Sequence, residues 1–326
     1  MTKTFKIALI GPGQIGSRYL QGLAGLGIGA SIEVVGRSEG AINTALSRFK
    51  EIVGSEAMEL VVRDGVSGLS DELDLAIVAT NADVRSNLVR ELAEKKGVKN
   101  LILEKVVFQK KSDFEDVGKL LERKNIRAWV NHPRRLYPVY KKIKTALKGT
   151  GPIELKVAGG SWGMACNGLH FLDLLAYLTD CEGLVVSNGG LDKKILESKR
   201  PGFKEVSGEL SGSLGANGFS FYCGEVISPV EITITSAEVA LKIREADNTY
   251  EIATRVGKWV WVRHNARFDY LQSETTSSVV EGILLDGRCD LPTLREARML
   301  HEPFLDSLTE HFNRYGSARY DACPIT

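Results

Sequence analysis

A glycine-rich segment near the start of the chain constrains the fold more than any other feature. The motif Gly11-Pro12-Gly13-Gln14-Ile15-Gly16 directly follows the apolar run Phe5–Ile10 and precedes residues 17–26, which have helical spacing. In such a G-x-G-x-x-G turn, the first glycine permits the tight turn, the second lets backbone approach a pyrophosphate, and the third lets the helix pack closely on the strand. The helix N-terminus adds N–H groups that favour phosphate. We therefore predict a dinucleotide-binding βαβ unit, with an ordinary glycine turn as the alternative.

The first part of the chain alternates short apolar runs with helical patterns. Runs that are almost continuously apolar are typical of strands buried on both faces of a parallel sheet. The predicted strands are Phe5–Ile10, Ser31–Val35, Glu59–Val62, Leu73–Ala79, Asn100–Leu103 and Arg127–Val130, and the predicted helices cover residues 17–26, 40–49, 83–96 and 112–124. This α/β pattern indicates a Rossmann-type, doubly wound NAD(P)-binding domain over residues 1–131.

The pattern changes after residue 131. Helices are expected over Tyr137–Leu147 and His170–Leu178, and residues 185–263 then form successive short strands separated by turn signals. The clearest strands are Phe219–Tyr222, Val230–Ile234, Val239–Ile243 and Trp259–Val262. A terminal helix spans residues 293–313, and whether it packs on the first domain stays open. Residues 132–326 are therefore expected to form an α+β domain for substrate binding and oligomerisation, built on a large, open, mostly antiparallel sheet.

Composition excludes several classes of protein. The chain has 326 residues with 42 Lys and Arg against 41 Asp and Glu, a formal charge of +1. Such a balance gives no electrostatic reason to expect nucleic acid or an anionic membrane as a partner. No run of about 18 apolar residues suggests a membrane helix, and the five cysteines are scattered without a Cys-x-x-Cys pair. We expect a soluble cytoplasmic protein with no disulfide framework and no metal site.

Residues 36–38 bear on the choice of coenzyme. Folds selective for NAD carry an acidic residue about 20 residues beyond the glycine turn, where it binds the ribose 2′-hydroxyl. This chain has Gly36-Arg37-Ser38 there. An arginine and a hydroxyl suit a 2′-phosphate, and no carboxylate repels it. We predict NADP in preference to NAD; a solvated arginine in a turn is the alternative.

Two groups of residues are candidates for the chemistry. Glu104 and Lys105 follow a predicted strand at its carboxyl end, where open α/β sheets bind ligands, and an ammonium group there would stabilise a developing alkoxide. His170 and Asp173 lie at i and i+3 of a helix, so the carboxylate could orient an imidazole that exchanges a proton with substrate. A surface lysine and a core histidine are the structural alternatives.

The order of these motifs resembles the Gfo/Idh/MocA oxidoreductase family. The resemblance rests on the glycine turn, Glu104-Lys105, a Gly-x-His-x-x-Asp near 170 and the segment Leu-Pro-Thr-Leu-x-Glu-Ala at 291–297. It extends to Ala79-Thr80-Asn81, where the family has a loop beside the nicotinamide. The resemblance implies a Rossmann domain followed by a large open sheet, hydride transfer between a nicotinamide and a sugar-like or nucleotide-sugar carbon, and a homodimer or homotetramer through that sheet. It also implies that Lys105 and His170 are catalytic, with Glu104, Thr80 and Asn81 near the coenzyme.

Two departures from the family pattern leave other functions open. Val106 stands where the family has the proline of Glu-Lys-Pro, and Cys166 stands where it has an aspartate before the histidine. We interpret Cys166 as a small buried residue without a nucleophilic role. A non-catalytic NADP-binding sensor or scaffold is one alternative, and a lyase or glycosidase that uses bound nicotinamide transiently is another.

The segments around residues 134 and 162 suggest a substrate class. Arg134 and Arg135 lie at the predicted domain junction and could hold a carboxylate or diphosphate. The Asn-x-Pro-Arg-Arg junction and the segment Trp162–Asn167 resemble relatives from bacterial surface-carbohydrate pathways. We therefore expect Arg134, Arg135, Trp162 and Asn167 to bind an acidic or nucleotide-linked sugar. The alternative is a basic hinge that serves the fold.

Overall fold

The computed structural model describes residues 3–55 and 58–326. The chain divides into two compact units. The first comprises Met1–Pro133 and Tyr270–Arg295, and the second comprises Arg134–Asp269 and Glu296–Thr326. The second domain was predicted to comprise residues 132–326; of that range, Tyr270–Arg295 lies in the first unit.

A six-stranded sheet with the order β3-β2-β1-β5-β7-β8 forms the centre of the first unit. All of its neighbouring strands pair in parallel. The chain runs from β1 outward to β3 and then resumes at β5 on the other side of β1, so the strand order reverses between β1 and β5. In open α/β sheets, ligands bind at the carboxyl ends of strands at such a reversal. The strands are β1 Phe5–Ile10, β2 Ala30–Val35, β3 Glu59–Arg63, β5 Leu75–Val78, β7 Asn100–Leu103 and β8 Arg127–Val130.

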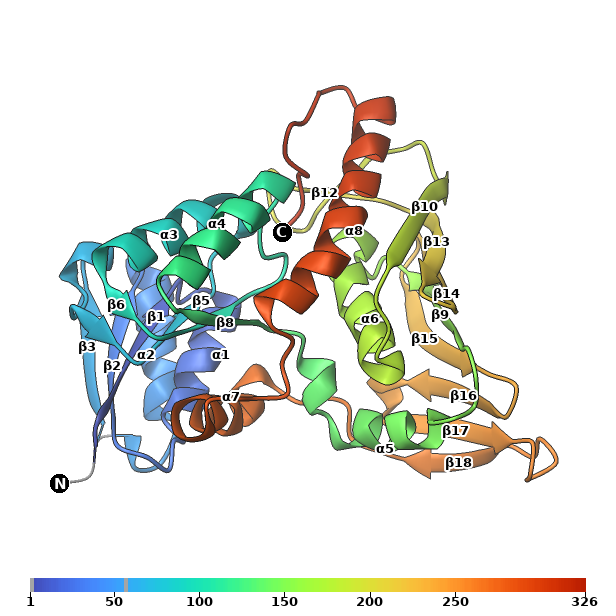
Figure 1. Ribbon diagram of the computed structural model, residues 1–326, viewed down its shortest axis with the longest axis horizontal. Coiled ribbons are helices and arrows are strands. Elements are labelled where there is room, and N and C mark those ends of the chain that lie inside the picture. The colour runs from blue at the N-terminus through green and yellow to red at the C-terminus, as the bar shows by residue number, and fades with distance from the viewer. Residues whose placement is uncertain (1–2, 56–57) are drawn as a thin grey trace. The chain divides into compact units, whose positions relative to one another are not determined.

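Helices flank this sheet, with α1 and α2 on one side and α3 and α4 on the other (Figure 1). Because helices cover both faces of the sheet, its central strands are buried along almost their whole length. Strands β5 and β7 are buried at every residue. The helices are α1 Gln14–Leu23, α2 Glu39–Lys50, α3 Ala82–Lys95, α4 Lys111–Arg123 and α7 Gln272–Glu281, and a short second sheet pairs β4 Glu72–Leu73 with β6 Gly97–Val98.

Helix α7 comes from the late part of the chain and packs on α1. The hydroxyl of Ser277 donates to the carbonyl oxygen of Gly22 at 2.7 Å. A Cβ at Gly22 would lie 2.6 Å from Ser273 O, so glycine is required for this close approach. The ladder of the sheet also continues into this late segment, where Trp129 and Thr293 form an antiparallel bridge.

An eight-stranded sheet with the order β10-β13-β14-β9-β15-β16-β17-β18 forms the second unit. Its neighbours pair antiparallel except for the parallel pair β14 and β9. The predicted combination of a Rossmann-type sheet and a large, mostly antiparallel sheet is confirmed. The strands are β9 Glu154–Gly160, β10 Leu184–Leu191, β13 Gly208–Leu214, β14 Asn217–Gly224, β15 Ser228–Thr235, β16 Val239–Arg244, β17 Thr249–Thr254 and β18 Val262–Asn265.

Helices α5 Pro138–Leu147, α6 Met164–Thr179 and α8 Leu294–Tyr315 accompany this sheet, with a short ribbon of β11 Leu196–Glu197 and β12 Lys204–Glu205. Figure 1 shows α6 and α8 beside the strands of the sheet. Helix α6 begins at Met164, six residues before its predicted start, and its apolar side chains are buried. Gly168 packs closely on Phe304 of α8: a Cβ at Gly168 would lie 3.0 Å from the Phe304 ring.

One local prediction was wrong. The segment Trp259–Val262 was predicted as a strand, but its first residues belong to a turn in which Trp259 has a φ of 59°, and β18 begins only at Val262. Helix α7 and strand β9 were not predicted at all. Within the described residues, no helix is both long and apolar enough to span a bilayer.

Candidate functional site

The glycine turn joins β1 to α1 at the point where the strand order reverses. The N–H of Gly11 donates to Val35 O at 2.9 Å and the N–H of Ala79 donates to Ile10 O at 2.8 Å, so the loops after β1, β2 and β5 stay in register. Gly11 has a φ of 89°, and a Cβ there would lie 2.8 Å from Thr80 Cγ2. A Cβ at Gly16 would lie 2.0 Å from Gly11 O. These two glycines are therefore required by packing.

Gly13 differs from both. An ideal Cβ at this residue meets no atom within 4 Å among the described residues, and Gly13, Gln14 and Ile15 are all exposed. Gly13 is also the N-cap of α1, which has no side-chain cap and no acidic residue in its first turn. The N–H groups at this end of α1 thus have no side-chain cap, and the positive end of the helix dipole lies behind them. This is the arrangement in which a helix N-terminus binds a phosphate.

The loop after β5 offers a second polar group at the same edge of the sheet. Thr80 Oγ1 is buried and, within the part of the chain that is described, has no hydrogen-bond partner. Asn81, the N-cap of α3, is exposed and makes no side-chain cap bond. Since buried hydroxyl groups are normally satisfied, Thr80 fits a site that a ligand completes. Together with the open backbone at Gly13, it fits a dinucleotide coenzyme.

The residues predicted to select the coenzyme have different surroundings. Arg37 is exposed and has no hydrogen bond or ion pair with the other described residues. Ser38 caps α2, its Oγ accepting from the N–H of Ala41 at 3.3 Å. Gly36 packs closely on Pro12: a Cβ at Gly36 would lie 2.7 Å from Pro12 Cγ. Packing thus accounts for this glycine, whereas sequence analysis considered only charge.

Glu104 and Lys105 follow β7, and the peptide bond between Lys105 and Val106 is cis. Glu104 is buried, and its Oε1 accepts from Tyr19 Oη at 2.8 Å and from Asn131 Nδ2 at 2.7 Å. Burial, together with this carboxylate, raises the pKa of Tyr19 well above its ordinary value, so the phenol stays protonated and donates. The Glu104 carboxylate therefore ties β7 to α1 and β8. Lys105 is half-buried beside it.

The arginines predicted to bind substrate are both paired with carboxylates of the second unit. Arg134 Nε donates to Glu245 Oε1 at 2.8 Å and its Nη2 donates to Oε2 at 2.6 Å. Tyr140 Oη also donates to Glu245 Oε1, at 2.6 Å. Burial alone would raise the pKa of Glu245, but Arg134 and Tyr140 outweigh it and hold that pKa below its usual range. The Arg134 guanidinium also lies 4.4 Å from the centre of the Phe171 ring.

Arg135 binds Asp173, the carboxylate predicted to orient His170. Arg135 Nε donates to Asp173 Oδ2 at 2.9 Å and its Nη2 donates to Oδ1 at 2.8 Å, and Asp173 is fully buried. Burial raises the pKa of Asp173 to about 6, although Arg135 opposes the rise. His170 is half-buried on the same helix. Sequence reasoning missed the Arg135 partner, which lies 38 positions away in the chain.

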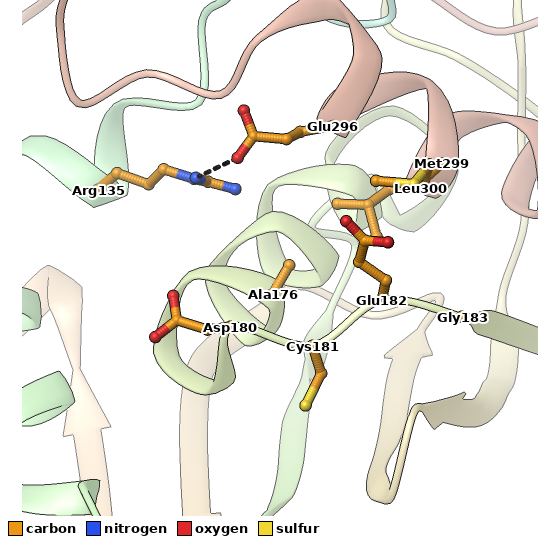
Figure 2. A pocket seen from close by; sticks show the side chains of 9 residues that line it. All are labelled: Arg135, Ala176, Asp180, Cys181, Glu182, Gly183, Glu296, Met299 and Leu300. Carbon is orange, nitrogen blue, oxygen red and sulfur yellow. Dashed lines mark ion pairs between the residues drawn. The ribbon is translucent and has the colours of Figure 1, made fainter.

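A cavity of about 150 Å³ lies beside Arg135 in the second unit. Figure 2 shows the Arg135 guanidinium reaching toward Glu296 at one side of it, with Nη1 and Oε1 3.7 Å apart. The other lining residues are Ala176, Asp180, Cys181, Glu182, Gly183, Met299 and Leu300. Three carboxylates against one guanidinium make this cavity unsuited to an anionic group. Arg135 is thus not presented to an acidic ligand here.

Trp162 and Asn167 support the N-terminus of α6. Asn167 Nδ2 donates to Trp162 O at 2.8 Å, and Trp162 Nε1 donates to Tyr222 O at 2.9 Å. The buried Glu205 carboxylate accepts from the N–H groups of Ala165 and Cys166 at 2.8 and 3.0 Å, which caps the helix. Cys166 was interpreted as buried; it is partly exposed, with its Sγ 3.7 Å from Ser198 Oγ. Among the described residues, no group of three or more His, Cys, Asp or Glu is arranged to hold a metal ion.

A Rossmann-type sheet with an open glycine turn, joined to a large antiparallel sheet, defines a two-domain protein of the dinucleotide-binding class. The family comparison then identifies it more closely. Residues 5–132 match the oxidoreductase family with an NAD-binding Rossmann fold, Gfo/Idh/MocA. The match covers the Rossmann-type part of the chain and confirms the family resemblance inferred from the motifs. A search of curated proteins gave no match.

Solved structures share the fold over nearly the whole chain. UDP-N-acetylglucosamine 3-dehydrogenase GnnA from Acidithiobacillus ferrooxidans is 14% identical with a TM-score of 0.70, covering 94% of this chain and 97% of its own. Biliverdin reductase from Synechocystis sp. PCC 6803, in complex with biliverdin and NADP⁺, is 12% identical with a TM-score of 0.71, covering 93% and 97%. The transcriptional regulator Gal80p from Kluyveromyces lactis is 13% identical with a TM-score of 0.70, covering 96% and 93%.

Proposed function

We propose that this protein is a nicotinamide-dependent oxidoreductase that interconverts an alcohol and a carbonyl group on a sugar-like substrate. The observation that carries the proposal is the open backbone at Gly13, at the uncapped N-terminus of α1. The family match over residues 5–132 and the similarity to a nucleotide-sugar dehydrogenase support the same reaction class. When bound, the coenzyme supplies the hydride donor or acceptor.

Residues of the chain would bind the coenzyme and assist the reaction on the substrate. The N–H groups of α1 bind the pyrophosphate, and the Thr80 hydroxyl, which lacks a partner among the described residues, binds the coenzyme near its nicotinamide end. The Lys105 ammonium group stabilises the negative charge that develops on the substrate oxygen. His170 is the candidate to exchange a proton with the substrate, and Asp173, which Arg135 holds through both carboxylate oxygens, lies one helical turn from it.

The decisive experiment compares Lys105→Ala with Lys110→Ala, an exposed lysine five positions further along. Both variants are titrated with NADPH by fluorescence and then assayed with a panel of keto-sugars by loss of absorbance at the reduced nicotinamide band. We expect NADPH binding to survive in both variants. Turnover should fall by about 10²–10⁴-fold only in Lys105→Ala, the range typical of a lost electrostatic or acid–base group. Equal turnover in the two variants would remove Lys105 from the chemistry.

We also propose that NADP is the preferred coenzyme. Arg37 is exposed beside the end of β2 and has no partner among the described side chains. Its guanidinium group can therefore form a bidentate hydrogen-bonded pair with a 2′-phosphate. Arg37→Gln is expected to weaken NADPH binding by about tenfold or more and leave NADH binding unchanged, since one charge-assisted contact is lost. A variant that weakens both coenzymes equally would contradict this role.

A cofactor-binding regulator without turnover is the second candidate. It is favoured by the replacement of the family's proline and aspartate by Val106 and Cys166 and by the shared fold of Gal80p, described as a transcriptional regulator. Tight NADPH binding without oxidation across a broad panel of keto-sugars would support this candidate over the enzyme.

A further inference from the structure

Arg85 is a charged side chain in the interior of the first unit. It lies on α3, is only 1% exposed, and is the largest fully buried side chain among the described residues. A buried guanidinium group is costly unless its N–H groups are hydrogen-bonded. The hydrogen-bond acceptors of Arg85 therefore indicate its structural role.

The acceptors of Arg85 are backbone carbonyl oxygens from two different loops. Nη1 donates to Glu104 O at 2.7 Å and to Val107 O at 3.0 Å. It also donates to Val106 O, and Nη2 donates to Thr80 O. One planar group thus connects the loop after β5 with the loop after β7. These strands are neighbours in the sheet, paired from Ala76 with Leu101 onward.

The two connected loops carry the groups proposed to meet the coenzyme. Thr80 comes from the first loop, and Lys105 lies between two residues of the second loop whose carbonyls Arg85 binds. The second loop is also fixed by its side chains, since Val106 and Val107 are fully buried. The Glu104 carboxylate accepts a hydrogen bond from Tyr19. The residues on both sides of Lys105 in the chain are therefore held by hydrogen bonds.

We propose that Arg85 is a positioning residue that holds Thr80 and Lys105 in a fixed relation to the bound nicotinamide. A guanidinium group suits this task because its five N–H donors lie in one plane and can reach several carbonyl oxygens together. A lysine ammonium group at the same place reaches fewer of them. The inference rests on the proposed function, because it assigns Lys105 to the coenzyme site.

The test measures the Lys105 amine directly. Wild type, Arg85→Met, Arg85→Lys and the control Arg90→Met are acetylated with and without saturating NADPH, and labelling of Lys105 is quantified by peptide mass spectrometry. Lys119, an exposed lysine of α4, is the internal reference. Arg90 is a matched control on the same helix, and its side chain pairs with Asp113 and Asp116.

We expect NADPH to protect Lys105 about tenfold in wild type and in Arg90→Met, the scale of one charge-assisted contact. Protection should fall below about twofold in Arg85→Met and be partly restored in Arg85→Lys, while both still bind NADPH. Full protection in folded Arg85→Met overturns the inference. If that variant does not fold, full protection in Arg85→Lys overturns it. Wild type that binds NADPH without protecting Lys105 overturns the proposed role of Lys105 instead.

Discussion

Substitution of Gly13 by alanine separates the structural part of the glycine turn from its binding part. The new methyl group meets no atom of the described residues within 4 Å, and Gly13 has a φ of −70° and a ψ of −159°, which alanine adopts without strain. Alanine lowers the entropy of the unfolded chain, worth about 0.4–1 kcal/mol of stability. It is a poorer N-cap than glycine by roughly the same amount. We therefore expect the free energy of unfolding to change by less than about 0.5 kcal/mol.

Gly16→Ala is the matched comparison, because the same methyl group is added three residues away. Its Cβ would lie 2.0 Å from Gly11 O, so the backbone of α1 or of the turn has to move by about 1 Å to restore a normal contact. Overpacking of this kind costs about 1–3 kcal/mol or more. Gly16→Ala should therefore lower the free energy of unfolding by at least 1 kcal/mol or so.

Urea unfolding and fluorescence titration with NADPH are measured for wild type and both variants. Gly13→Ala should unfold like wild type and yet bind NADPH about tenfold more weakly or worse, because the methyl group keeps the pyrophosphate from the N–H groups of α1. Wild-type affinity in a stable Gly13→Ala protein would refute the argument that the open face of Gly13 is the pyrophosphate site. A loss of stability equal to that of Gly16→Ala would refute the assumed open space.

Two further predictions concern stability in the second unit. Glu245→Gln removes the charge that Arg134 binds, so the free energy of unfolding at pH 7, measured in urea, should fall by roughly 2–3 kcal/mol. This is less than for a fully buried pair, because 24% of the Glu245 side chain is exposed. Since the folded pKa of Glu245 is lowered, wild type loses this contribution only below pH 4.5, where the stabilities of the two proteins should converge. Burial lowers the pKa of His311, whose Nε2 lies 3.0 Å from Asp192 O. Because the folded pKa of His311 is depressed, wild type should lose stability as the pH falls below 6.5, and His311→Gln should flatten that slope in urea unfolding.

The central strands of the first unit could be predicted from the sequence because they are buried on both faces. Ile7, Leu9, Ile77 and Leu103 are all fully buried, so each apolar run coincides with a strand. The prediction of a strand from an apolar run failed at Trp259–Val262, where the apolar side chains are exposed. Val260, for example, is 65% exposed. An apolar run is therefore a more dependable sign of a strand where its side chains are buried.

The contacts that decide side-chain roles could not be predicted, because they join distant parts of the chain. Glu104 receives its hydrogen bond from Tyr19, 85 positions earlier, and Asp173 receives one from Arg135, 38 positions earlier. Helix α7 escaped prediction because its polar sequence has little periodicity. It is specified by tertiary packing on Gly22 of α1, a contact about 250 residues away in sequence.

Glycine in a sequence is ambiguous between close packing and ligand approach, and the structure separates the two. A Cβ at Gly36 would overlap Pro12, and a Cβ at Gly168 would overlap Phe304, so both residues are explained without any ligand. Gly11 and Gly16 are explained in the same way. Gly13 alone among these has no atom to avoid, so the fold gives no packing reason for a glycine there. Four of the five glycines would therefore suit any protein with this fold, and the space beside Gly13 is what favours a bound pyrophosphate.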